Sequence, residues 1–259
     1  MSCLCLKLRA GDYTAVDDSE VSISSLALKH SLLGKIQRFQ GKFHEALHQL
    51  DIPLNIVDRY KSQNHGLYFN EDIHDLACNY ADTLRELGFF EQAEKYLRLR
   101  IDAASVASVA PASRFVIEAS LAECLFAKGH RKVREAQDEV ALGACSALEE
   151  ARELCLQLQS QKSLLRFERL RTLLTLAKIS FVQGDYSEAE GFLSKSTNLM
   201  SKFDRTNGYA TMAIIKTMIE TLQRSPVKDD WEIKQRSIQQ SREKLNMLKT
   251  SANEGGIRY

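Results

Sequence analysis

The apolar residues of this chain recur at intervals of three and four positions, which is the spacing of an amphipathic helix, and one such pattern occurs three times. Each copy reads glycine, any residue, an aromatic residue, two further residues, alanine, and a leucine four positions after the alanine. The three copies, GKFHEALHQL, GFFEQAEKYL and GDYSEAEGFL, begin at Gly41, Gly88 and Gly184. Seven positions before each of these glycines stands a small residue: Gly34, Ala81 and Ala177. Three copies of one pattern predict an internal repeat.

Each copy predicts a helix, a tight turn and a second, antiparallel helix. The glycine is expected to end the first helix, because a helix end often needs a left-handed backbone. The small residue of the first helix lets the second helix approach closely. The matching contact on the second helix is the repeated alanine: Ala46, Ala93 and Ala189. The aromatic residue, this alanine and the following leucine share one face of the second helix.

At these positions the chain resembles the tetratricopeptide repeat (TPR), a family whose pattern has Leu-Gly in the first helix and then Tyr, Ala and Phe at set intervals. Leu33-Gly34 reproduces the Leu-Gly pair. Other residues stand in place of the family's Trp: His30, Ala77 and Leu173. The first step between copies is 47 residues and the second is 96, against 34 in a standard array. These long steps are similar to kinesin-light-chain arrays, and the resemblance implies an all-α superhelix. The pattern along the chain predicts about nine or ten helices and no strand.

The pattern divides the chain into three parts. These are an N-terminal segment at 1–19, expected to be partly disordered, a TPR-like helical repeat domain at 20–250, and a flexible tail at 251–259. Within the repeat domain the three clear copies occupy 27–60, 74–107 and 170–203, and terminal helices are expected at 206–250. The weak repeats and the abrupt start leave open that the chain is a fragment of a longer array.

A degenerate pair of helices is expected at 113–160, in the long interval between the second and third copies. The stretch LAECLFAKG repeats the first-helix half and ends at Gly129, where the other copies have their turn glycine. The second helix resumes after HRKVREAQDEV, with apolar residues at helical intervals: Ala144, Leu148, Ala151, Cys155 and Leu158.

Composition supports a helical protein and disfavours several function classes. Only 3 prolines and 12 glycines occur in 259 residues. Lys plus Arg number 35 against 34 for Asp plus Glu, so charge gives no argument for nucleic acid or a membrane as a partner. No apolar stretch is long enough to span a bilayer. The six cysteines form no C-x-x-C, which favours reduced thiols in the cytoplasm or the nucleus. No glycine-rich phosphate-binding motif occurs, so neither a cofactor nor a small-molecule substrate is predicted.

One short motif points to an enzyme instead. His44, Glu45 and His48 fit the H-E-x-x-H pattern of zinc peptidases, in which two histidines one turn apart bind the metal and the glutamate acts as base. The third ligand is not distinctive, and Glu71 is the candidate for it. The third copy also has an acid, Glu188, directly before its repeat alanine. We therefore interpret Glu45 as part of the repeat and keep a zinc metallopeptidase as the alternative.

The resemblance implies a protein-binding function, because stacked helix pairs form an extended concave surface lined by the first helices. We therefore expect an interaction scaffold that binds a peptide or a helix of a partner protein. The candidate residues of this face are Lys35, Arg38, Asn79, Asp82, Arg85, Arg171 and Lys178. Their smaller neighbours on the same face are Ser31, Cys78 and Thr175. The repeated cations suit an acidic peptide or a C-terminal carboxylate. Two alternatives remain: these side chains are only solvated, or the chain is a structural subunit of a larger assembly.

Overall fold

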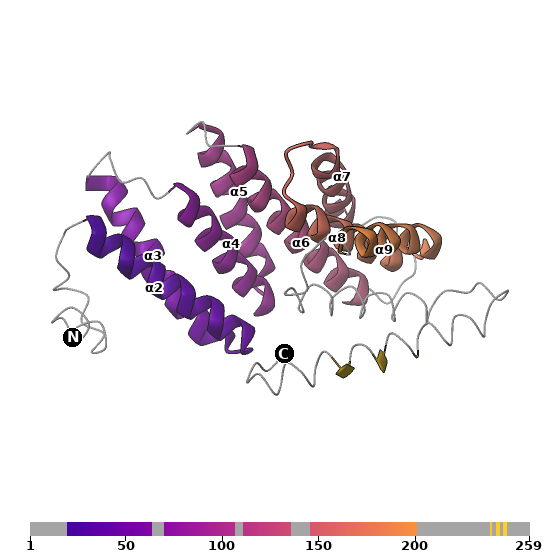
Figure 1. Ribbon diagram of the computed structural model, residues 1–259, viewed down its shortest axis with the longest axis horizontal. Coiled ribbons are helices and arrows are strands. Elements are labelled where there is room, and N and C mark those ends of the chain that lie inside the picture. The colour runs from indigo at the N-terminus through magenta and orange to yellow at the C-terminus, as the bar shows by residue number, and fades with distance from the viewer. Residues whose placement is uncertain are drawn as a thin grey trace.

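The computed structural model describes residues 20–63, 70–106, 111–135 and 146–200, together with the isolated positions 239, 242, 243, 246 and 247. These residues contain eight helices and no strand (Figure 1). The helices are α2 (Glu20–Phe39), α3 (Phe43–Gln63), α4 (Asn70–Glu86), α5 (Phe90–Val106), α6 (Pro111–Glu135), α7 (Ser146–Ser160), α8 (Arg166–Val182) and α9 (Tyr186–Met200). The predicted all-α fold is confirmed for this part of the chain.

Several predicted segments fall on residues that the structure does not describe. The N-terminal segment at 1–19 and the tail at 251–259 lie outside the described residues, as do nearly all of the terminal helices expected at 206–250. The isolated positions 239, 242, 243, 246 and 247 are helical. None of the described helices is long and apolar enough to cross a bilayer.

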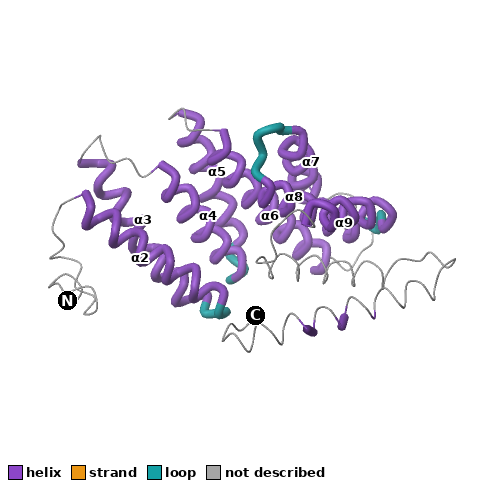
Figure 2. The backbone as a smooth tube through the Cα atoms, viewed as in Figure 1, coloured by secondary structure: helices purple, strands orange, loops and turns teal. Residues whose placement is uncertain are grey.

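The helices are arranged as four stacked hairpins. α2 packs on α3, α4 on α5, α6 on α7 and α8 on α9, and each second helix also packs on the first helix of the next hairpin. The first helices contact one another in the order α2, α4, α6, α8. Figures 1 and 2 show the resulting array, which runs from the indigo helix α2 to the orange helix α9 and has short turns between α2 and α3, α4 and α5, and α8 and α9. This is a helical-repeat fold, as predicted.

Three of the hairpins turn at the glycines of the repeated pattern. Gly41, Gly88 and Gly184 have φ values of 74°, 82° and 83°, in the left-handed region. At the first turn, the amide of Lys42 donates to the carbonyl of Gln37 and that of Gly41 to Arg38, and the other two turns repeat both bonds. This pair of bonds satisfies the last carbonyls of the helix and requires a residue with positive φ. A Cβ at any of the three glycines would meet nothing within 4 Å, so the backbone angle, and not lack of space, demands glycine there.

Small residues hold the two helices of a hairpin close together. A Cβ built on Gly34 of α2 would lie only 2.5 Å from Cγ of Leu50 and 3.2 Å from the carbonyl oxygen of Ala46, both on α3. The corresponding residues of the other hairpins are alanines, and all of them are buried: Ala81, Ala93, Ala177 and Ala189. Close packing of this kind excludes larger side chains at these positions.

The third hairpin departs from the predicted turn. α6 continues through Gly129 to Glu135, so Gly129 does not end the first helix as the sequence pattern predicted. A Cβ at Gly129 would lie 2.7 Å from Cγ of Leu148 on α7, so this glycine permits a close helix contact. The residues that follow, HRKVRE, are compatible with helix and contain no breaker, which explains why the helix does not stop. The buried residues of α7 include four of the predicted apolar positions: Leu148, Ala151, Cys155 and Leu158.

Candidate functional site

The histidines of the HEALH motif lie on the outer face of α3. His44, Glu45 and His48 are exposed, whereas Ala46 and Leu50 are fully buried against α2. Within the part of the chain that the structure describes, no group of three or more His, Cys, Asp or Glu residues could hold a metal ion. The side chain of Glu71, the candidate third ligand, lies outside the part of the chain so described. The buried positions of the motif are those of the repeat pattern.

The acid that precedes the repeat alanine has a structural partner in the last hairpin. Glu188 of α9 accepts hydrogen bonds from both terminal nitrogens of Arg152 of α7, at 2.8 and 2.5 Å, and from Oγ of Ser180 of α8 at 2.6 Å. Hydrogen bonding to Arg152 holds the pKa of Glu188 below its usual value. An acid at this place can therefore join neighbouring hairpins.

We call the face lined by the first helices α2, α4, α6 and α8 the inner face. Most of the polar residues predicted for it meet in one ionic network. Asp82 of α4 lies at its centre, and three arginines from three helices surround it. Its Oδ2 is 3.3 Å from Nη2 of Arg38 of α2 and 3.6 Å from Nη2 of Arg171 of α8, and its Oδ1 is 3.2 Å from Nη1 of Arg85. Because the first helices stack on one another, residues of α2, α4 and α8 reach a single carboxylate.

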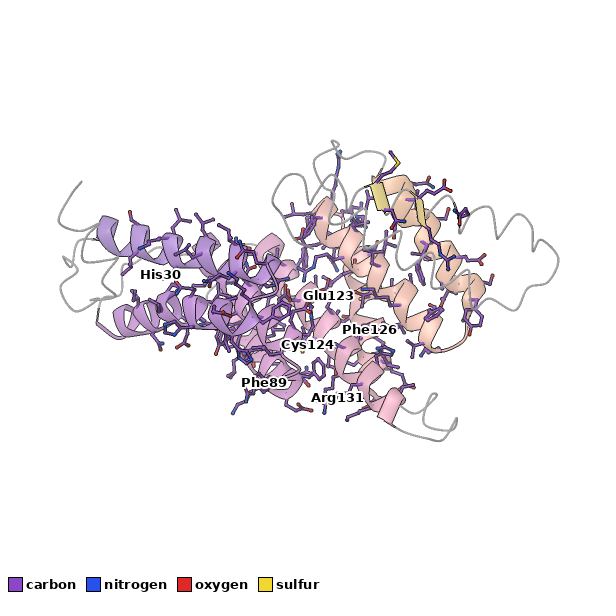
Figure 3. All side chains as sticks on the ribbon, turned by 90° about the horizontal axis from the view of Figure 1, so that it is seen from below. His30, Phe89, Glu123, Cys124, Phe126 and Arg131 are labelled. Carbon is purple, nitrogen blue, oxygen red and sulfur yellow. The ribbon has the colours of Figure 1, made fainter. Side chains whose placement is uncertain are left out.

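Glu123 of α6 is the second carboxylate of this network, and the sequence analysis missed it. It accepts a 2.6 Å hydrogen bond from Nη1 of Arg85, and Nε and Nη2 of Arg171 bind its two oxygens at 2.8 and 3.1 Å. Such a two-pronged contact is the strongest form of arginine–carboxylate pairing. Nη2 of Arg171 also donates to Oγ of Ser120 at 3.1 Å. Figure 3 shows Glu123 midway along the array, between the purple and the orange helices.

Repeat register is the signal that could have found Glu123. Ala122 is the small residue of α6, since it packs in one cluster with Cys155 of α7 as Gly34 packs on Leu50. The residue directly after the small residue is charged in all four first helices: Lys35, Asp82, Glu123 and Lys178. In the stretch LAECLFAKG this position is Glu123, directly after Ala122, so the alignment at Gly129 already contained the signal.

We call Arg38, Asp82, Arg85, Glu123 and Arg171 the inner-face network. Burial alone would raise the pKa of Glu123, but the guanidinium groups of Arg171 and Arg85 hold it well below its usual range. Burial alone would lower the pKa of Arg85, but Asp82 and Glu123 raise it above its ordinary value. These directions mean that Glu123 and Arg85 are ionised at neutral pH.

The remaining predicted residues lie at the edges of the network. Lys35 of α2 forms an ion pair with Asp75 of α4. Asn79 accepts a 3.0 Å hydrogen bond from Arg38 and donates to the backbone and side chain of Asp75 at 2.7 and 3.2 Å. The charge of Lys178 of α8 contributes to lowering the pKa of Glu123. The alternative that these residues are only solvated therefore does not describe their geometry.

The smaller residues predicted for the same face are packed away from solvent. Ser31, Cys78 and Thr175 are buried, and so are Asn79 and Asp82. Burial raises the pKa of the Cys78 thiol to about 12, so this cysteine is neutral. Of the residues predicted for this face, the arginines and lysines are the ones that remain partly exposed.

The inner-face network is rich in arginine and is not completely covered. Its three guanidinium groups face the carboxylates of Asp82 and Glu123, and Arg85 also pairs with Glu86 at 3.4 Å. The side chains of Arg38, Arg85 and Arg171 are between 14% and 17% exposed. The arginines are thus held in fixed positions by internal acids while part of each remains open to a ligand.

Fold and network together define a helical-repeat protein whose first helices are joined by partly exposed arginines and internal acids. The sequence matches no protein-family model and no curated protein. Among solved structures the chain is similar to one described as "Assembly Chaperone of RpL4 (Acl4) (Residues 1-338)". The two share 16% sequence identity with a TM-score of 0.44, and the match covers 96% of each chain. A similarity of this degree does not assign a family or a function.

Proposed function

We propose that this protein is a TPR-type adaptor that binds an acidic peptide, or the acidic face of a helix, of a partner protein along the inner face of α2, α4, α6 and α8. The observation that carries the proposal is the inner-face network, built from four successive first helices, in which three arginines remain partly exposed. A ligand that supplies a carboxylate would bind the exposed parts of these arginines.

The network is suited to recognition because its arginines are already ordered. Asp82 and Glu123 hold Arg85 and Arg171 by direct ion pairs. A ligand therefore does not have to fix flexible side chains, which lowers the entropic cost of binding. Arginine also offers several donors in one plane, so a guanidinium that is paired on one side can still bind a carboxylate on the other.

The binding experiment uses a short fluorescein-labelled peptide of alternating Asp and Ala, with alternating Asn and Ala as the neutral counterpart. We expect fluorescence anisotropy to show binding of the acidic peptide that weakens with added salt, because exposed charge pairs are screened. Arg171→Gln should weaken binding by about tenfold, equivalent to about 1.4 kcal/mol. The matched control is Arg98→Gln, since Arg98 pairs with Glu94 and Glu150 on the second helices.

A second arm identifies natural partners. The unmodified chain, Arg171→Gln and Arg98→Gln are each used to capture proteins from native extract, after circular dichroism has shown equal helicity. The proposal expects a set of partners that Arg171→Gln loses and Arg98→Gln retains. If Arg171→Gln keeps every partner and binds the acidic peptide as tightly as the unmodified chain, the inner face is not the binding site.

A further inference from the structure

One face of α2 is exposed although the equivalent face is buried on every other first helix that the structure describes. Two positions after the small residue, Ile36 of α2 is 52% exposed, whereas its equivalents are buried: Thr83, Cys124 and Ile179. Two positions before the small residue, Leu32 is 49% exposed, whereas its equivalents are again buried: Asn79, Ser120 and Thr175. Leu28 and Leu33 extend the exposed area. We call Leu28, Leu32, Leu33 and Ile36 the α2 end face.

In the inner hairpins, the preceding hairpin covers this face. Leu50 and Leu54 of α3 pack against Leu76 of α4, and α5 packs on α6 and α7 on α8. No described residue precedes α2, so nothing in the described part of the chain occupies the corresponding place. The terminal unit of a helical array normally has a polar outer face. Four large exposed apolar side chains at this place indicate an interaction surface.

We propose that residues 1–10 of the chain form a short helix that docks on the α2 end face through Leu4, Cys5 and Leu8. In all three described interfaces the covering helix immediately precedes the covered one in sequence. Only short linkers separate them: 64–69, 107–110 and 161–165. Residues 11–19 would connect the docked helix to Glu20, where α2 begins.

The sequence of the segment fits this role. Leu8 is four residues after Leu4 and three after Cys5, so the three share one face of a helix. Gly11 follows as a helix end, and Lys7 and Arg9 would lie in the last turn, where cations are favourable. Ten helical residues extend about 15 Å and the stretch from Leu28 to Ile36 about 12 Å, so one covers the other. A tethered segment also acts at an effective concentration of about 1 mM, which favours it over a separate molecule.

Charge disfavours a second copy of the chain as the occupant. An antiparallel pair of α2 helices centred on Leu32 would set Lys29 of one copy opposite Lys35 of the other. Facing like charges across such a contact is destabilising. The proposed intramolecular contact is independent of the inner-face network, and the adaptor function can fail without affecting it.

The two N-terminal cysteines supply the test, which measures their rates of alkylation by N-ethylmaleimide in the folded full-length chain. Cys3 and Cys5 lie about 200° apart around a helix, so Cys5 would be covered when Cys3 is not. Mass spectrometry of peptides reads each rate, and we expect Cys5 to react about tenfold more slowly than Cys3. Leu32→Asp should bring Cys5 to the rate of Cys3. The matched control is Leu99→Asp, because Leu99 is an exposed leucine of α5, and there Cys5 should stay slow.

Each other outcome overturns the proposal. Equal rates for Cys3 and Cys5 in the unmodified chain would show that the segment does not dock. Slow reaction of Cys5 that survives Leu32→Asp would place the segment elsewhere. Protection that disappears on dilution, with a dimer mass by light scattering, would make a second copy the occupant. Circular dichroism verifies that Leu32→Asp folds, which is expected because Leu32 is half exposed.

Discussion

Arg171 of α8 and Asp82 of α4 lie 3.6 Å apart, although the hairpin of α6 and α7 stands between their hairpins in the stack. Glu123 of α6 fills the space beside them and binds Arg171 through both of its oxygens. The charged side chains therefore connect hairpins that are not neighbours. Removal of one member should affect the stability of the whole array, because the others are left without their counter-charge.

We expect Asp82→Asn to lower the free energy of unfolding by about 2–3 kcal/mol, since three arginines would lose a shared carboxylate in a mostly buried place. Urea denaturation followed by circular dichroism measures the change. The matched control is Asp102→Asn at an exposed acid of α5, which should change stability by less than about 0.5 kcal/mol. Equal small effects of both variants would mean that the ion pairs of Asp82 contribute nothing to the fold.

The low pKa of Glu123 predicts a particular pH dependence. A carboxyl group whose pKa is lower in the folded state stabilises the fold fully above its unfolded pKa of about 4.3, and this contribution is lost as pH falls toward the folded value. The difference in unfolding free energy between the unmodified chain and Glu123→Gln should therefore be constant above about pH 5 and shrink below about pH 4. Urea denaturation across this range measures it. A difference that stays the same down to pH 3 would be inconsistent with the paired Glu123.

Two glycine-to-alanine substitutions should have opposite effects. Gly88→Ala should destabilise the protein by about 1 kcal/mol, because Gly88 has a φ of 82° that alanine adopts at a cost. Gly191 lies within α9, and a Cβ there also meets nothing within 4 Å. Gly191→Ala should therefore stabilise by about 0.5–1 kcal/mol through helix propensity. Thermal unfolding of both variants checks the signs, and the same sign for both would contradict the turn assignment.

The close approach of α2 and α3 can be tested at Gly34. Gly34→Ala should cost about 1–3 kcal/mol, because the new methyl group would overlap Leu50. Shortening the neighbour in the double variant Gly34→Ala with Leu50→Val should cost less than the sum of the two single changes, since the residues are in contact. Chemical denaturation of the four proteins gives the coupling energy. Strict additivity would show that the two helices adjust without strain.

The hairpins could be predicted from the sequence because the residues that define each turn and each helix contact lie close together in the chain. In GKFHEALHQL, the turn glycine, the buried Ala46 and the buried Leu50 lie within ten residues, and the structure uses each of them as the pattern predicted. Gly129 shows the limit of such signals. It occurs in a similar stretch, but the helix continues through it, since the residues beyond it favour helix and a close contact with Leu148 uses the glycine differently.

The sequence by itself determined the helical class of the protein, three of its turns and the apolar faces that pair within each hairpin, because these depend on residues close together in the chain. Only the tertiary structure decided that the predicted inner-face residues bind one another. The pairs of Glu123 with Arg85 and Arg171 join residues 38 and 48 positions apart, and the stacking of α4, α6 and α8 sets their distances. Ion pairing depends on these distances and on burial, which a pattern of residue types along one helix does not contain.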